Sequence, residues 1–235
     1  AVAYGADAVY IGGARFGARQ AAGNSAEEIA RVVEYAHRFG VRVHATLNTL
    51  VWDDELEAAE RQARSLIDAG VDALIVQDMA LRRMDLPVEL HASTQVSNRT
   101  PEGARFLGEA GVVRVILERN LTLEEIRAIC AATAAEVECF VHGAVCVGYS
   151  GRCFLSRSMS AQRQSRGVQP ALPPDVGPHR RKGSDLDCRE ASAVGTRHES
   201  FATHWRSAGC GRHFIQDRRS AQGSRLYPER CGPLP

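Results

Sequence analysis

The first 162 residues of this 235-residue chain contain no lysine, and their 16 arginines are outnumbered by 21 acidic residues. Their net charge is −5. Residues 163–235 have a net charge of +6, because they contain 13 basic and seven acidic residues. A reversal of charge between two parts of a chain indicates that they differ in role or origin. We therefore expect a partial domain at residues 1–162 and an irregular, largely disordered tail at residues 163–235.

The chain also lacks the marks of a membrane or secreted protein. No apolar run approaches the roughly 18 residues of a membrane span, and no basic segment followed by an apolar one suggests a signal peptide. The seven cysteines are an odd number scattered over several contexts, which argues against a disulfide framework. We expect a reducing, cytoplasmic compartment and no membrane partner. Because the first residue is Ala1, we expect the native start to lie upstream.

Three common catalytic motifs are missing. Residues 12–17 follow the first expected strand with the wrong spacing for G-x-G-x-x-G, so a dinucleotide-binding fold loses its main support. Ser150 is not a nucleophile elbow, because the second glycine of G-x-S-x-G is replaced by Arg152. No H-E-x-x-H occurs, so a zinc protease is unsupported.

What is present is an alternation of strand and helix patterns. Capping boxes at Ser25 and Thr122 and a cap at Thr100 open amphipathic helices. Glycines recur just before strands, at Gly40, Gly70 and Gly111, and Gly70 ends its helix as a left-handed cap would. Such alternation predicts a parallel sheet covered by helices, either a TIM-type barrel or an open doubly wound sheet. The expected strands are residues 8–11, 41–47, 73–76, 88–93, 112–117 and 137–141.

Polar residues gather at the carboxyl ends of these strands, which is where a (β/α) barrel carries its active site. Any one of them can simply cap a loop, but the whole set on one edge favours a binding site. The set is Arg15, Asn48, Gln77, Asp78, His91, Ser93, Thr94, Gln95, Glu118 and His142.

A glycine-rich loop after the last expected strand carries Cys146 and Cys153. The glycines and Arg152 suit thiolates that are closely approached by a metal or an iron–sulfur cluster. Free cysteine is also a small buried hydrophobe, so a structural role stays open.

Five segments together resemble a known family. Residues 5–13, 46–49, 91–95, 140–146 and 149–153 are similar to the collagenase-like peptidases of unknown catalytic type, peptidase family U32. The resemblance covers about residues 1–162, and its last two segments are the most specific.

The resemblance implies a TIM-barrel-like domain with an oxygen-sensitive 4Fe-4S cluster held by four cysteines. Members of the family hydroxylate a base in tRNA or rRNA, some with prephenate as co-substrate, and others act in ubiquinone synthesis. By analogy, Cys146 and Cys153 are cluster ligands, and His142 and His91 are candidate catalytic residues. The candidate substrate-binding residues are Arg15, Asn48, Ser93, Thr94, Gln95 and Glu118.

The tail departs from the family, which continues with segments like R-G-x-C-x-Q-P-C-R and S-F-K-I-E-G-R-L-K. Residues 165–173 and 213–222 regain these two motifs when GC-rich codons for them are read one base later. Our hypothesis is a frameshift near residues 160–164. The tail's own histidines and cysteines follow no trusted metal spacing.

The same comparison implies that the first and last barrel strands are missing, leaving six strands with two unpaired edges and poor solubility. With two of four cluster ligands, we expect the chain to be inactive. Two alternatives to an RNA hydroxylation factor remain: a protease acting on collagen-like substrates, and a non-catalytic scaffold fragment.

Overall fold

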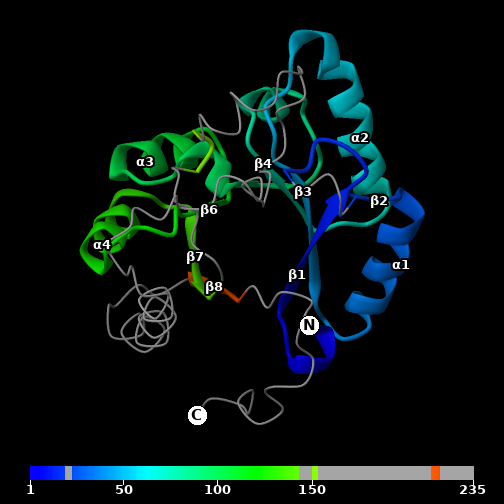
Figure 1. Ribbon diagram of the computed structural model, residues 1–235, viewed down its shortest axis with the longest axis horizontal. Helices are drawn as coiled ribbons and strands as arrows, with labels where there is room; N and C mark the ends of the chain where they lie inside the picture. Colours follow the sequence, from blue (N-terminus) through cyan, green and yellow to red (C-terminus); the bar gives the residue numbers. More distant parts are fainter. Residues whose placement is uncertain (19–22, 143–149, 153–212, 218–235) are drawn as a thin grey trace, which may run out of the picture.

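The computed structural model describes residues 1–18, 23–142, 150–152 and 213–217. Strands and helices alternate along this part of the chain (Figure 1). The strands are β1 (Ala8–Gly13), β2 (Gly23–Asn24), β3 (Arg42–Leu47), β4 (Ala73–Val76), β5 (Glu89–Ala92), β6 (Arg114–Ile116), β7 (Glu136–His142) and β8 (His213–Asp217). The α-helices are α1 (Ala26–His37), α2 (Leu56–Asp68), α3 (Pro101–Glu109) and α4 (Leu123–Ala132), and the short 3-10 helices are η1 (Val2–Tyr4), η3 (Asp53–Glu55), η4 (Met79–Arg83) and η5 (Thr94–Val96).

The helix starts follow from side chains that satisfy the first free N–H groups. The Ser25 hydroxyl accepts a hydrogen bond from the backbone N–H of Glu28, whose carboxylate accepts one from the Ser25 N–H. Thr122 and Glu125 repeat this capping box at α4. Each reciprocal pair satisfies two N–H groups that the helix itself leaves without partners. Both capping boxes were predicted from sequence and are confirmed.

All the strands run parallel in one sheet, in the order β2-β1-β3-β4-β5-β6-β7-β8. β1 pairs with both β2 and β3, and from β3 onward each strand pairs with the next one along the chain. A doubly wound sheet reverses its order at a switch point. Among the described strands only the two-residue β2 lies out of chain order, so the sheet order favours the barrel-like alternative. The predicted TIM-barrel-like fold is confirmed, as a sheet that is not a closed barrel: within the described residues β2 and β8 do not pair with each other.

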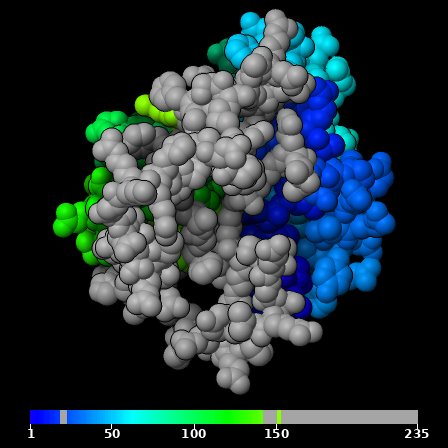
Figure 2. Space-filling view, in the orientation of Figure 1, coloured from blue at the N-terminus to red at the C-terminus, as the bar shows by residue number. Residues whose placement is uncertain are grey.

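Helices cover one face of the sheet in two separate groups. α1 and α2 pack on β1, β3 and β4 through a core that includes Ile29, Leu47 and Leu66. α3 and α4 pack on β6 and β7 through a second core that includes Leu107 and Ile129. The two helix pairs lie on opposite flanks of the molecule (Figure 1), and the space-filling view shows α1 in blue on one flank and the green helices on the other (Figure 2).

The opposite face of the sheet, here called the inner face, is curled on itself. The Tyr10 hydroxyl of β1 donates a 2.5 Å hydrogen bond to a carboxylate oxygen of Glu138 on β7. Four strands lie between β1 and β7 in the sheet. Because neighbouring strands are about 4.8 Å apart, a flat sheet would separate these side chains far beyond contact. The inner face therefore closes around its side chains as a barrel does.

The edges differ from the expectation of six strands. Gly12 and Gly13 of β1 pair with Gly23 and Asn24 of β2, and five tail residues form β8 beside β7. The prediction of an irregular, largely disordered tail concerns residues 163–235, of which the structure describes these five alone. The backbone N–H and C=O groups at the outer edge of β7 favour pairing with another strand. The sequence of β8 includes phenylalanine and isoleucine, which are common in strands.

Replacing Tyr10 with phenylalanine tests the closure of the inner face. The Tyr10→Phe change removes the donor and leaves a buried carboxyl oxygen without it, so the free energy of unfolding should fall by about 1–3 kcal/mol. Tyr35→Phe on the exposed side of α1 is the matched control and should change it by less than about 0.5 kcal/mol. Urea unfolding measures both; equal effects of the two changes would contradict the closure.

Candidate functional site

The carboxyl edge of the sheet, where the strands end, brings two predicted residues into contact. The Asn48 side-chain amide donates a 3.2 Å hydrogen bond to the Ser93 hydroxyl, across the end of β4. The Asn48 carbonyl oxygen accepts a 2.9 Å bond from the N–H of Ala18 in the loop after β1. Ser93 is buried. Asn48 and Ser93 thus fix three strand ends at one place, as their sequence positions predicted.

The turn that follows β5 is held from both ends. The Ser93 hydroxyl caps η5 by accepting the N–H of Gln95, and this turn contains Thr94. The carbonyl of Gln95 accepts a 3.0 Å hydrogen bond from the Gln77 side chain at the end of β4. The predicted residues Ser93, Thr94 and Gln95 therefore form one rigid turn at the carboxyl edge.

Glu118 lies on the same edge, beside two residues that sequence reasoning missed. Its carboxylate accepts a 2.8 Å hydrogen bond from the Ser97 hydroxyl, and its N–H donates to the carbonyl of Asn98. The buried Asn98 amide lies within hydrogen-bond distance of the carbonyls of Ala92, Ser93 and Ile116. Asn98 thereby ties the ends of β5 and β6 together. Asn98 lies outside every expected strand, so no sequence pattern pointed to its role.

The glycine-rich loop returns to this edge at Gly151. A Cβ added to Gly151 would lie 1.9 Å from the Gln95 carbonyl oxygen, so only a glycine permits the observed approach. The φ of +71° at Gly151 is also in the left-handed region that favours glycine. The described end of the loop, Ser150 to Arg152, therefore packs directly on the turn after β5.

The remaining predicted residues are placed differently. Arg15 is exposed, with its guanidinium carbon 5.0 Å from the ring centroid of Phe16, and no hydrogen bond of the described residues joins it to Asn48 or Ser93. His142 ends β7, and its side chain lies outside the described part. Cys146 and Cys153 also lie outside the described residues.

The described residues form neither a metal-binding cluster nor a membrane-spanning helix. In residues 1–18, 23–142, 150–152 and 213–217, no group of three or more His, Cys, Asp or Glu side chains is arranged to hold a metal ion. No helix in the same part of the chain is long and apolar enough to span a membrane.

His91 lies on the inner face, against a histidine that was not predicted as a site residue. The rings of His44 and His91 meet edge to face with centroids 4.8 Å apart, and the ring of Tyr10 stacks on His44 at 5.3 Å. Both histidines are fully buried. Burial lowers the pKa of His44 to about 4 and that of His91 to about 2, where the neighbouring His44 adds to the effect. Both imidazoles are therefore neutral at pH 7.

Three further polar residues lie on the inner face, and none of them was predicted as a site residue. They are Arg114, Glu136 and Glu138. Arg114 lies 3.6 Å from the Glu138 carboxylate and donates two hydrogen bonds to Glu136. Burial raises the pKa of Glu138 to about 7, against the opposing effects of Tyr10 and Arg114. The sequence does hold a signal: single polar residues, His44, Arg114 and Glu138, alternate with apolar ones in otherwise apolar strands.

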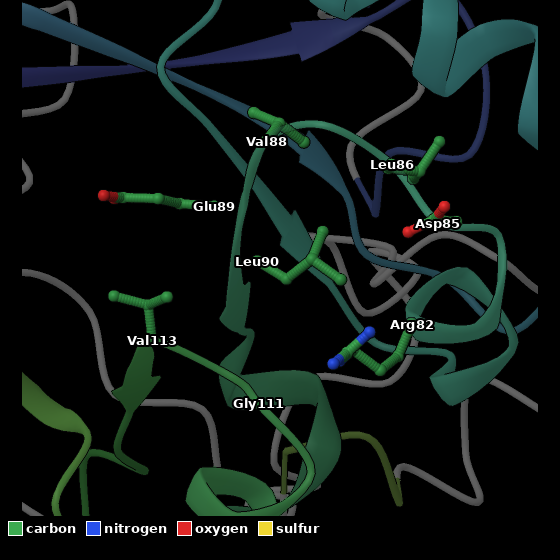
Figure 3. Close-up of a pocket in the computed structure, with 8 residues that line it drawn as sticks. All are labelled: Arg82, Asp85, Leu86, Val88, Glu89, Leu90, Gly111 and Val113. Carbon is green, nitrogen blue, oxygen red and sulfur yellow. The ribbon is translucent and has the colours of Figure 1, made fainter.

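A separate groove lies at the other edge of the sheet, at the amino ends of β5 and β6 (Figure 3). Its volume is about 200 Å³, below the usual range for small-molecule sites. Its Arg82 side chain is engaged, because Nε donates a 2.6 Å hydrogen bond to the carbonyl of Ala110. The groove is lined by Arg82, Asp85, Leu86, Val88, Glu89, Leu90, Gly111 and Val113 and shares no residue with the carboxyl edge.

Comparison with known proteins shows which family this chain matches. The sequence profile of a family described as Peptidase family U32 matches residues 1–168. The chain is 52% identical over 168 residues to the 23S rRNA 5-hydroxycytidine C2501 synthase of Escherichia coli (strain K12), which covers 71% of this chain and 26% of that protein. It is 41% identical over 172 residues to tRNA hydroxylation protein P1 of Bacillus subtilis (strain 168), covering 71% and 41%. The chain thus spans about a quarter to two fifths of the length of these relatives.

Among solved structures, the U32 peptidase Mk0906 aligns with a TM-score of 0.52 at 20% sequence identity, covering 60% of this chain and 63% of that one. At this identity the likeness concerns the fold alone. The family resemblance expected from the sequence motifs is confirmed, and so is the fold that it implied.

Gly151 allows a sharp test of how the loop packs. Gly151→Ala should lower the free energy of unfolding by about 2 kcal/mol or more, because strain at positive φ adds to a collision with the Gln95 carbonyl. Gly40→Ala is the matched control, since Gly40 has a φ of +68° and no atom near its Cβ position. Denaturant unfolding of both variants separates strain from collision; equal losses would contradict the close packing.

Glu138 makes stability depend on pH in a definite direction. Its pKa is raised from 4.5 to about 7 in the folded state, so its contribution is complete below pH 4.5 and is lost as the pH rises through 7. Between pH 5 and 8, Glu138→Gln should flatten this decline by roughly 1–3 kcal/mol. His44 and His91 act in the opposite direction below pH 6.5, equally in both proteins. Parallel pH profiles for wild type and variant would refute the assignment.

Proposed function

Because the chain belongs to peptidase family U32, we propose that it carries the substrate-binding barrel of an iron–sulfur-dependent RNA-base hydroxylation factor. The observation that carries the proposal is the 52% identity to a protein named as an rRNA 5-hydroxycytidine synthase. The family match at residues 1–168 includes every candidate site residue from Arg15 to Cys153. The RNA, tRNA or rRNA, is the macromolecular partner in this proposal.

The carboxyl edge suits an uncharged base. Asn48, Ser93 and Gln95 present amide, hydroxyl and backbone groups that donate and accept hydrogen bonds without bringing a net charge. Enzymes that modify a base in RNA read its edge through such groups once it leaves its stack. Glu118, held by Ser97, is an acidic group at the same edge and can orient an amino group or hold a proton. We assign binding and orientation of the base to these side chains.

The same contacts speak against the peptidase alternative. A serine nucleophile needs a base that takes its proton, and the Ser93 hydroxyl instead accepts hydrogen bonds from two amide groups. Ser97 donates to Glu118, with no histidine hydrogen-bonded to either side chain in the described residues. Neither Ser93 nor Ser97 is therefore paired with a histidine as the serine nucleophile of a peptidase would be.

In this proposal, a 4Fe-4S cluster supplies one-electron chemistry when it is bound. The packing of Gly151 on Gln95 brings the end of the cysteine loop to the carboxyl edge, and Cys153 is the residue after Arg152. Cys146 and Cys153 would provide two of its thiolates. The family match ends at residue 168, near the proposed change of reading frame, which supports the idea that further ligands are lost in the tail.

The other parts of the proposal follow from the reaction. Prephenate is the co-substrate that we expect to supply the oxygen, and His91 and His142 are the candidate catalytic residues. A protein that modifies RNA with an oxygen-sensitive cluster belongs in a reducing compartment, so we place it in the cytoplasm.

Iron content and base hydroxylation test the proposal together. After anaerobic purification, this chain should hold clearly less iron than the four atoms of a full cluster and leave RNA unmodified. A version shifted by one base near residue 162 should hold close to four and form 5-hydroxypyrimidine with prephenate, as measured by mass spectrometry of digested RNA. In that version Cys153→Ala should abolish both, whereas Cys130→Ala on α4 is the matched control and should keep both.

Two outcomes would refute the proposal. A full cluster in the chain as it stands would remove the reading-frame argument. Cleavage of gelatin by the clean protein, with no hydroxylated base formed by either version, would favour the peptidase.

A further inference from the structure

The loop after β3 displays two large apolar side chains at the carboxyl edge of the sheet. Leu50 is 48% exposed and Trp52 is 58% exposed. Val51, which lies between them, packs against the core beneath α1 and α2. The segment thus alternates as an extended chain does, with Val51 turned inward and its two neighbours turned outward. Two such side chains on one side of a loop make a small patch, whereas a single one would need no explanation.

Hydrogen bonds fix the backbone of this loop. The buried Thr49 hydroxyl donates a 3.2 Å hydrogen bond to a carbonyl of the loop after β1. Asp78 accepts a 3.0 Å hydrogen bond from the N–H of Val51, and Glu55 accepts a 3.2 Å one from the N–H of Trp52. A side chain on a backbone that is already ordered loses less entropy when it binds a partner. Tryptophan is also among the residue types that dominate the energy of protein interfaces.

The charge around Trp52 is negative. Residues 50–60 include no basic residue and five acidic ones, which are Asp53, Asp54, Glu55, Glu57 and Glu60. Arg61 and Arg64 form ion pairs with Glu57 and Glu60 along α2, whereas Asp53 is exposed directly beside Trp52 in the sequence. An RNA backbone is held by lysine and arginine, so this stretch does not suit a chain of phosphates. A basic partner complements it.

We propose that Leu50, Trp52 and η3 form a docking surface for a basic segment of another protein, rich in arginine or lysine. An apolar side chain of that segment lies against Leu50 and Trp52, and its cations face Asp53. An arginine can also stack on the indole of Trp52, which adds a cation–π contact. So small a patch fits a weak, transient interface. The inference goes beyond the proposed function, because the ligand of this surface is a protein and not RNA.

Tryptophan emission gives a direct readout of this surface. The chain has two tryptophans, so Trp205→Phe leaves Trp52 as the reporter in an otherwise complete chain. The probe is a short synthetic peptide in which arginines flank a central leucine. Its addition should shift the emission of Trp52 to shorter wavelength, because the indole loses contact with water. High salt should reverse the shift, since exposed charge pairs are screened. The same peptide with glutamate in place of arginine is the control and should cause no shift.

Variants of the full chain separate specific docking from general adhesion. A fluorescein-labelled arginine peptide should bind at least about tenfold more weakly to Trp52→Ala and to Asp53→Asn, as measured by anisotropy. Phe39→Ala is the matched apolar control, because Phe39 is 62% exposed just after α1. Asp68→Asn, at the exposed end of α2, is the matched acidic control. Both controls should keep wild-type affinity. All four changes are at exposed side chains, so the melting temperatures should stay close to that of wild type.

Other results overturn the inference. No shift with the arginine peptide, or equal weakening by Phe39→Ala and Trp52→Ala, means that the surface takes no basic protein segment. A shift caused by single-stranded oligouridine assigns Trp52 to RNA. A shift that follows protein concentration without peptide assigns the surface to a second copy of the chain, and a shift with salt alone assigns it to the basic residues 163–235. The proposed hydroxylation is measured separately, on digested RNA, so the two proposals fail separately.

Discussion

The hydrogen bond from Tyr10 to Glu138 is the constraint on which the rest of the molecule depends, because it joins β1 to β7 across the inner face. Without that curl, a parallel sheet with helices on one face would leave its other face open. With the curl, the ends of the strands converge, and side chains from loops far apart in sequence meet at the carboxyl edge. The contact between Asn48 and Ser93 is a local consequence of this closure.

The composition of the inner face is unusual for a barrel, whose interior is normally filled by branched apolar side chains. Among the described residues, Ile75, Ile116 and Phe140 form a small apolar cluster on that face, beside two neutral histidines and the Glu138 and Arg114 pair. Burying so many polar groups lowers stability. Stability that is given up at one place in a fold commonly marks function there.

Local rules made much of this structure predictable. Capping boxes at Ser25 and Thr122 and the left-handed Gly70 depend only on neighbouring residues, and sequence reasoning found all three. The edge residues Asn48 and Ser93 followed from their position at strand ends. His44 and Glu138 were missed because their role comes from contacts across the sheet, with Tyr10 128 residues from Glu138. β8 was missed because it depends on an edge supplied by β7, which no pattern within residues 213–217 reveals.

The two helix-side cores described above share no residue: one contains Leu47 and Leu66, and the other contains Leu107 and Ile129. In folding terms, each half of the sheet with its own pair of helices has the make-up of a cooperative unit that can form and open by itself. Contacts within each half are short in sequence, whereas the Tyr10 contact closes a loop of more than a hundred residues and is entropically the most demanding. Docking of the two halves, rather than the formation of either one, is therefore the step that assembles the inner face.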